Sequence, residues 1–216
     1  MKILSLECTA GPASAAITED GHVIASSFVN VKLTHSQTLL PMAEGLFAAA
    51  RLGLSDIDGI AVTAGPGSFT GVRIGICAAN AMAAAFGKPV AAASSLEGLL
   101  YGIDNACALL DCRNGNGYAM VKYEGFSPEP MAVVIDDLLS TLPDGILMAG
   151  DGAVMHRERI LNALPNARFA EGNDIIADRI GLAAYDKLVR GETVIEALPL
   201  YLRPSQAERL AKERNK

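Results

Sequence analysis

Glycine-rich turns are the segments of this sequence with the clearest chemical potential. The run Gly65-Pro66-Gly67-Ser68-Phe69-Thr70-Gly71 follows a short apolar stretch at 59–64 and leads into an alanine-rich stretch that reaches about residue 86. A loop between a strand and a helix points backbone N–H groups and the positive end of the helix at any bound anion. The same glycines would also permit a tight turn and a close helix–strand contact, and the loop contains no Walker lysine. Phosphate binding and close packing therefore both stay open at this point.

A second candidate position lies where the first predicted strand ends, at Glu7-Cys8-Thr9. Actin-like ATPases carry Asp here, followed by Gly and by Ser or Thr, to organise magnesium and phosphate. Because Glu is longer and the glycine is missing, we do not expect this chain to hydrolyse a nucleotide by itself. Ala149-Gly150-Asp151-Gly152 resembles Ala64-Gly65-Pro66-Gly67 and follows a later strand in the same way. The candidate anion-binding positions are Thr9, Gly65, Gly67, Ser68, Gly150 and Gly152.

Metal-binding residues are few. The chain has three histidines, His22, His35 and His156, and no two of them lie within one or two helical turns. Its four cysteines match neither C-x-x-C nor a zinc ribbon in spacing, which indicates free thiols in a reducing compartment. His35 follows Thr34 in a Ser/Thr-x-x-Gln pattern and is predicted to start a helix. We therefore predict no metal site, and no spacing specifically supports a Ser-His-Asp triad.

The overall charge excludes some kinds of partner. The 216 residues contain 18 Lys and Arg against 24 Asp and Glu, a formal net charge of −6. A surface that binds nucleic acid by itself needs clustered basic residues, so this chain would need a partner to do so. Residues 203–216 carry five basic and two acidic residues, which indicates a solvated helix end. Because neither an apolar leader nor an uncharged run of about 18 apolar residues is visible, we expect a cytoplasmic protein without membrane contact.

Hydrophobic periodicity predicts two similar halves. The first half is predicted to contain strands at 2–6, 13–18, 22–29, 59–64 and 90–93, and helices at about 35–51, at 71–86 and from Ser94. The second is predicted to contain strands at 105–110, 117–123, 131–135 and 145–149, and helices near 136–141, near 174–190 and after Pro204. This repeat predicts an α/β fold of two tandem ribonuclease-H-like lobes with mixed sheets, as in actin, Hsp70 and sugar kinases. We place the lobes at residues 1–103 and 104–216, with the last helix able to pack back on the first lobe.

The predicted helix after the first glycine loop has an unusually shallow face. Small residues recur every four positions, at Gly71, Gly75, Ala79 and Ala83. A neighbouring apolar stripe consists of Ile74, Ala78 and Met82. These residues could pack against the chain's own sheet. They could also form an oligomer or partner interface, because a helix that is apolar all round has a second face to cover.

Taken together, these motifs resemble the TsaB family, also called YeaZ. The resemblance spans nearly the whole chain and is most specific in the glycine loop and the Ser-Ser-Leu-Glu segment. Its motifs are Thr63-Ala64-Gly65-Pro66-Gly67-Ser68-Phe69-Thr70-Gly71-Val72-Arg73-Ile74-Gly75, Ala93-Ser94-Ser95-Leu96-Glu97, Asp111-Cys112-Arg113, Gly150-Asp151-Gly152 and Pro199-Leu200-Tyr201-Leu202-Arg203. Two positions depart from the family pattern: Glu7-Cys8-Thr9 replaces the usual Asp-Thr-Ser, and Cys112 stands where Ala is common.

The resemblance implies a bacterial protein required to make threonylcarbamoyladenosine next to the anticodon of tRNA. The catalytic relative TsaD carries His-Met-Glu-Gly-His for its metal, whereas the matching stretch here is Ser95-Leu96-Glu97-Gly98-Leu99. Both imidazoles are missing, so the resemblance implies a non-catalytic scaffold and activator without a metal or cofactor of its own. ATP or ADP is expected only at a composite site formed with partners.

The implied partners are a TsaD-like catalytic subunit and a TsaE-like ATPase, with tRNA bound only through the complex. Without these partners the chain is expected to form a homodimer. Pairing is expected through the helices at about 35–51 and 71–86. The implied interface residues are Leu39, Met42, Leu46, Gly71, Ile74, Gly75, Ala78, Ala79 and Met82.

Two other functions stay open. A metallo-glycoprotease-like peptidase would hold a stoichiometric metal ion, and a free-standing actin-fold ATPase would turn over ATP without partners. Metal analysis and an ATP turnover assay on the isolated chain distinguish these functions from a scaffold.

Overall fold

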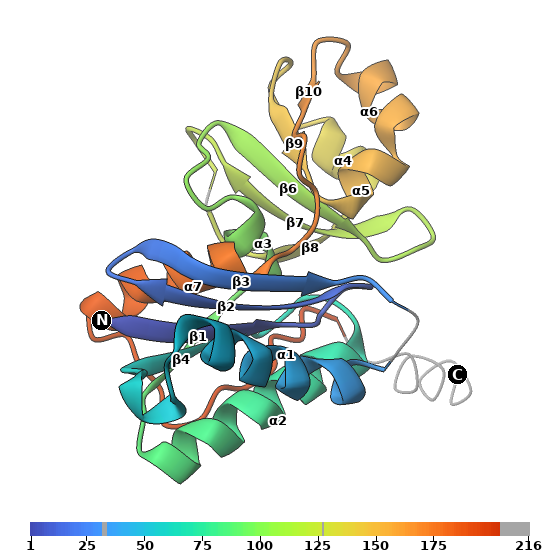
Figure 1. The fold of residues 1–216 in the computed structure, drawn as a ribbon. Coiled ribbons are helices and arrows are strands. Elements are labelled where there is room, and N and C mark those ends of the chain that lie inside the picture. Colours follow the sequence, from blue (N-terminus) through green and yellow to red (C-terminus); the bar gives the residue numbers. More distant parts are fainter. Residues whose placement is uncertain (32–33, 127, 204–216) are drawn as a thin grey trace, which may run out of the picture.

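The computed structural model describes residues 1–31, 34–126 and 128–203. Two lobes, each built on a five-stranded mixed sheet, lie one above the other with the short helix α3 between them (Figure 1). The strand order is β3-β2-β1-β4-β5 in the first sheet and β10-β9-β6-β7-β8 in the second. In each sheet the first three strands form an antiparallel meander, and the fourth pairs parallel to the first. This repeated topology confirms the predicted α/β fold of two similar halves.

The first lobe is a sheet covered by helices on both faces. Its elements are β1 (Lys2–Glu7), β2 (Ala13–Glu19), β3 (His22–Val29), α1 (His35–Ala50), the 3-10 helix η1 (Leu54–Asp56), β4 (Gly59–Thr63), α2 (Phe69–Phe86), β5 (Val90–Ala93), α3 (Ser95–Leu99) and, from the end of the chain, α7 (Ala177–Val189). Helices α1 and α2 cover one face, and α7 covers the other. Alternation along β1 explains this arrangement, because Leu4 and Leu6 join the core under α1 and α2, whereas Ile3 joins the core with Ile180 of α7.

The second lobe repeats the sheet with shorter helices. Its elements are β6 (Ala106–Asp111), β7 (Asn116–Lys122), β8 (Met131–Val134), α4 (Ile135–Leu139), β9 (Leu147–Ala149), α5 (Asp151–Met155), α6 (Arg157–Ala163) and β10 (Arg168–Phe169). Cys107 and Leu109 of β6 face the core that includes α4, α5 and α6. Ala106 and Ala108 face α3 instead. Helix α3 therefore packs against the second sheet and joins the two lobes.

The chain returns to the first lobe after the second sheet. Helix α7 packs on β1, β2 and β4, and the following segment reaches α2, where Asn80 exchanges two hydrogen bonds with the backbone of Ala197 (3.0 and 2.9 Å). Residues 177–200 therefore pack on the first lobe, whereas the sequence pattern assigns 104–216 to the second lobe. The reason is that the first sheet has a second apolar face, which α7 covers. The helix predicted after Pro204 lies outside the described residues.

Most other elements match the predicted ranges, and the differences concern short segments. The predicted helix at 136–141 is α4 at 135–139, the strand at 145–149 begins only at Leu147, and α7 begins at Ala177 rather than near 174. Helices α5 and α6 and strand β10 were not predicted. With five, seven and two residues, they are too short to show a hydrophobic period.

The two predicted helix starts, at Thr34 and at Ser94, are capped in different ways. Ser94 accepts a hydrogen bond from the backbone N–H of Glu97 (2.9 Å), and the Glu97 carboxylate accepts one from the N–H of Ser94 (2.5 Å), which forms a capping box and confirms the helix start at α3. Thr34 precedes α1 but makes no such bond. Its hydroxyl donates to the side-chain oxygen of Gln37 instead (2.8 Å), so the predicted capping box is wrong, whereas the predicted helix start at His35 is confirmed.

Helix α2 is long and apolar enough to cross a membrane by length and composition, which the sequence analysis had not expected. It packs one face, including Val72, Ile76 and Ala83, into the core above the first sheet. Its high hydropathy therefore has an explanation within the fold, since a helix of this kind covers the sheet of a globular lobe.

The start of α2 approaches the end of β1 unusually closely. A Cβ atom built on Gly71 would lie 2.0 Å from the carbonyl oxygen of Cys8, and one on Gly67 would lie 2.5 Å from that of Thr9. Neither carbonyl is the end of a flexible side chain, so the backbone would have to move. The close-packing interpretation of these two glycines is therefore correct, whatever else the loop binds.

We predict that Gly71→Ala lowers the free energy of unfolding by about 3 kcal/mol, because the added methyl group forces α2 away from β1. Gly45→Ala in α1 is the matched control, since no atom lies within 4 Å of its added Cβ. We expect Gly45→Ala to raise the stability by about 0.5–1 kcal/mol through helix propensity. Urea unfolding of the two variants checks both values, and equal effects would contradict the close approach.

Candidate functional site in the cleft between the lobes

The ends of β1 and β6 meet at a cleft between the two lobes. The cleft holds a cavity of about 280 Å³. It is lined by Thr9, Ala10, Gly67, Ser68, Leu110, Asp111, Cys112, Arg113, Tyr118, Asp151 and Ile175. The structure thus brings together three of the predicted anion-binding residues, Thr9, Gly67 and Ser68, from the first lobe. Gly65, Gly150 and Gly152 are not among the lining residues of this cavity.

Glu7 lies behind the first-lobe wall and is almost completely buried, with 1% exposed surface. One carboxylate oxygen accepts hydrogen bonds from the backbone N–H and the hydroxyl of Thr9 (both 2.6 Å). The other oxygen has no hydrogen-bond partner among the described residues. Burial raises the pKa of Glu7, and the hydrogen bonds from Thr9 offset this only in part. Glu7 therefore supports the turn into Thr9. Its burial favours the protonated, neutral form of the carboxyl group.

The glycine loop uses much of its hydrogen-bonding capacity within the chain. The N–H of Ser68 donates to the carbonyl of Thr9 (2.7 Å), and the N–H of Gly71 donates to the hydroxyl of Ser68 (3.3 Å). On the other side, Ser95 donates from its N–H to Gly65 (2.9 Å) and from its hydroxyl to Pro66 (2.7 Å). The loop is thus held at both ends, and anion binding by its remaining groups stays a prediction.

The second-lobe wall contains a carboxylate–imidazole pair that the sequence analysis missed. The two oxygens of Asp111 contact the ring Nε2 of His156 (2.9 Å) and accept from the N–H of Arg113 (3.1 Å). Asp151 accepts from the N–H of Asp111 (3.1 Å). Burial raises the pKa of Asp151, and the nearby charge of Asp111 adds a smaller effect in the same direction. No sequence signal could have found His156, because 45 residues separate it from Asp111.

Two further predicted positions, Gly150 and Gly152, serve packing behind this wall. A Cβ on Gly150 would lie 2.4 Å from the carbonyl oxygen of Leu109, and one on Gly152 would lie 2.9 Å from the same oxygen. The N–H of Gly150 donates to the side chain of Asn173 (2.8 Å). Cys112, which lines the cleft cavity, accepts a hydrogen bond through its sulfur from Arg203 (3.0 Å).

The polar groups of the site leave little for metal chemistry. Within residues 1–31, 34–126 and 128–203, no group of three or more His, Cys, Asp or Glu residues could hold a metal ion. Glu97, the acid of the Ser95–Leu99 segment, caps α3 and forms an ion pair with Lys187 (2.9 Å). Asp111 and Asp151 can bind polar or cationic groups. Both are already bonded within their own chain, Asp111 to His156 and to the N–H of Arg113, and Asp151 to the N–H of Asp111.

The predicted partner-interface residues separate into two groups. Six of them are buried within the first lobe itself: Leu39, Met42, Leu46, Gly71, Gly75 and Ala79. Three are only partly buried and pack at the edge of the same core: Ile74, Ala78 and Met82. The six buried residues support the helices from inside, because the shallow stripe faces β1 and β4 rather than solvent. The outer face of α2 is formed by other exposed residues, among them Arg73, Cys77, Ala81, Ala84 and Ala85.

The topology and the cleft define a two-lobed protein of the ribonuclease-H-like class. A solved structure with this fold is the "Activator of the 2-Hydroxyisocaproyl-CoA Dehydratase from Clostridium difficile", with a TM-score of 0.53 and 11% identity over 89% of this chain and 97% of that one. The family model "TsaD: tRNA N6-adenosine threonylcarbamoyltransferase" matches residues 29–141, just over half of the chain.

Relatives with higher sequence identity identify the family within this fold class. The chain is 28% identical to the tRNA threonylcarbamoyladenosine biosynthesis protein TsaB of Bacillus subtilis, over 96% of each chain. The structure of YeaZ from Pseudomonas aeruginosa matches with a TM-score of 0.78 and 29% identity, over 93% of this chain and 99% of that one. The chain belongs to the TsaB (YeaZ) family of tRNA threonylcarbamoyladenosine biosynthesis proteins, which is related to TsaD. This confirms the resemblance inferred from the glycine-loop and Ser-Ser-Leu-Glu motifs.

We predict that Glu7→Gln removes a pH-dependent loss of stability. Burial raises the native pKa of Glu7 above its ordinary value of 4.5, so the native state keeps a proton that the unfolded state has released. The stability that this proton supports is complete below pH 4.5 and is lost as the pH rises toward the native pKa. The unfolding free energy of Glu7→Gln minus that of the wild type should therefore increase with pH over this range.

Urea unfolding at several pH values between 4.5 and 8 measures this difference. Asn162→Gln is the control, because Asn162 is exposed on α6 and the change replaces one uncharged amide by another, so its difference should not vary with pH. A difference for Glu7→Gln that stays constant or decreases with pH would show that this carboxyl is charged in the native protein.

Proposed function

We propose that the chain acts as a non-catalytic scaffold and activator subunit in the threonylcarbamoylation of tRNA, next to the anticodon. It would act with a TsaD-like catalytic subunit and a TsaE-like ATPase, and it would contact tRNA through that complex. One observation carries this proposal. The carboxylates of its cleft are bonded to the chain's own backbone and to His156, and no described residues are grouped to hold a catalytic metal.

The outer faces of α1 and α2 are the proposed partner surface. The two helices pack side by side, and between them they contain only one acidic and one basic residue, Glu44 and Arg73. Leu40 is half exposed, and small residues such as Gly45, Ala48 and Ala81 are exposed nearby. A shallow surface with little charge costs little to desolvate and lets another helix pair approach closely.

The partly buried residues Ile74, Ala78 and Met82 supply the border of this surface, while Leu39, Met42 and Leu46 fix α1 beneath it. We propose that the same surface pairs two copies of the chain when the catalytic subunit is absent. Because a homodimer and a heterodimer would then compete for one face, the two assemblies would exclude each other.

A nucleotide would bind at a composite site rather than in this chain alone. The cleft cavity of about 280 Å³ is slightly smaller than typical ligand pockets, whose volumes are roughly 300–1,000 Å³. Its second-lobe wall carries Asp111 and Asp151, whose carboxylates oppose a triphosphate, and Arg113 is the one Lys or Arg among the described residues that line the cavity. Because one arginine does not balance the two aspartates and the phosphates, we propose that ATP or ADP binds only when a partner subunit adds further cationic groups.

We expect Ala81→Glu and Cys77→Glu to weaken binding of the TsaD-like subunit at least about tenfold, because each places a charge in the centre of the interface. Both residues are exposed in the single chain, so folding should be unaffected. Ala163→Glu, on an exposed position of α6, is the matched control. A pull-down with purified subunits measures binding, and wild-type binding by both variants would exclude this surface. Charges at Gly75 or Ala79 are unsuitable, since those residues lie in the core.

We expect depletion of this protein in the cell to remove threonylcarbamoyladenosine from tRNA, because the catalytic subunit then lacks its scaffold. Mass analysis of tRNA nucleosides measures the modification. The wild type and Ala163→Glu should restore it, whereas Ala81→Glu should not. Unchanged modification after depletion would contradict the proposal.

Two other measurements test the alternative functions. Stoichiometric zinc or iron in the purified chain would favour the peptidase instead, and ATP turnover by the isolated chain would favour the ATPase.

A further inference from the structure

Strand β3 forms an open edge of the first sheet. Among the residues that the structure describes, no strand pairs with its outer side. The run from Val23 to Val31 contains neither a charged residue nor a proline, the features that most often prevent an edge strand from pairing. A bulge displaces Ile24, but the register with β2 is regular from Ala25 to Val29. This stretch therefore offers its free N–H and carbonyl groups to another extended segment.

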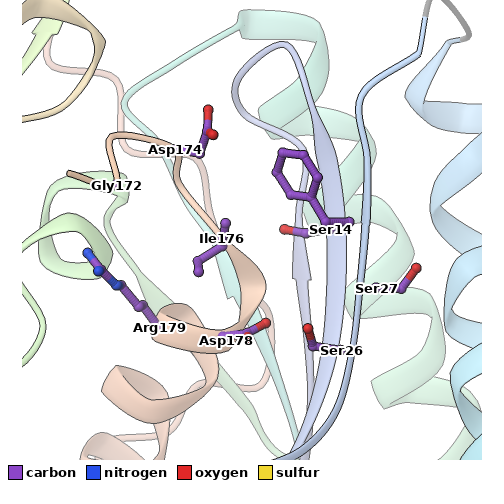
Figure 2. A pocket seen from close by; sticks show the side chains of 9 residues that line it. Ser14, Ser26, Ser27, Gly172, Asp174, Ile176, Asp178 and Arg179 are labelled. Atoms are coloured by element: carbon purple, nitrogen blue, oxygen red, sulfur yellow. The ribbon is translucent and has the colours of Figure 1, made fainter. Parts of the chain in front are cut away.

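A cavity of about 370 Å³ opens beside this strand, between β3 and the segment that leads into α7 (Figure 2). Phe28 and Ile176 supply its apolar walls, and Ser26 lies on the β3 side, whereas the side chain of Ser27 points away from Ile176 and Asp178 (Figure 2). Phe28 is 46% exposed, which is unusual for a phenylalanine in a sheet next to a covered face. The walls could hold a long aliphatic or aromatic side chain.

Two carboxylates at this cavity lack compensating charges. Asp174 and Asp178 form no ion pair or hydrogen bond through their side chains within the described part of the chain. The one basic residue of the cavity, Arg179, donates to the carbonyl of Leu99 (3.2 Å). Figure 2 shows its side chain pointing away from Asp178 and Ser26. The cavity therefore combines apolar walls with a negative potential.

We propose that the β3 edge and this cavity bind an extended segment of a partner protein, which adds a sixth strand and inserts a lysine or arginine side chain. The backbone of the segment would pair with residues 25–29. The methylene groups of the basic side chain would lie on Phe28 and Ile176, and its charged end would reach Asp174 and Asp178. Charge complementarity selects this occupant, since an acidic segment would meet two uncompensated carboxylates. This surface involves neither the cleft nor the outer faces of α1 and α2.

Fluorescence anisotropy with the full chain tests this proposal. The probes are two labelled hexapeptides of alternating Val and Thr, one with a central Lys and one with a central Glu. We expect the Lys probe to bind at least about tenfold more tightly than the Glu probe. The double variant Asp174→Asn with Asp178→Asn should weaken binding of the Lys probe by about the same factor, whereas Asp137→Asn, an exposed control in α4, should not. Amide chemical shifts should change at 25–29 and 172–179.

Several outcomes would overturn the proposal. These are equal affinity for the two probes, no binding of either, no effect of the double Asp→Asn variant, or shift changes elsewhere. Two further outcomes would identify a different occupant. If removal of residues 204–216, which carry Arg209, Lys212, Arg214 and Lys216, raises the affinity for the Lys probe, the chain's own tail fills the cavity. If Phe28→Lys abolishes self-association of the chain, the occupant is a second copy.

Discussion

The close approach of α2 to the end of β1 is the contact on which the rest of the first lobe depends. Gly67 and Gly71 lie against the carbonyl groups of Thr9 and Cys8, at distances that exclude a side chain. This contact fixes the glycine loop, which in turn holds α3 through the hydrogen bonds of Ser95 to Gly65 and Pro66. Because α3 also packs on the second sheet, the position of one lobe relative to the other follows from the same contact.

The cleft that results has the position of a ligand site in a two-lobed protein, but its polar groups serve the fold. Glu7 is buried and bonded to Thr9, and Asp111 is bonded to His156 and to the backbone of its own turn. Glu97 caps α3 and pairs with Lys187. Carboxylates that are bonded in this way stabilise the turns that carry them.

The outer surface differs from the cleft, because several of its groups are not bonded within the part of the chain that the structure describes. The outer faces of α1 and α2 have small side chains and almost no charge, and the β3 edge has free backbone groups beside uncompensated carboxylates. Groups left unsatisfied on the surface of a single chain are the ones that a partner can satisfy. The distribution of bonded and free groups therefore agrees with the scaffold role that we propose for this chain.

The sequence by itself determined the repeated strand order, most helices and the family, because hydrophobic period and glycine motifs are local signals. The glycine loop between a predicted strand and a predicted helix also indicated that Gly67 and Gly71 permit a tight turn and a close helix–strand contact. Only the tertiary structure decided which face of α2 is inside, since its apolar residues surround the helix and both orientations satisfy the same pattern. The pairing of Asp111 with His156 and the cavity beside Phe28 likewise required the fold. Each joins segments far apart in the chain, and no local signal connects them.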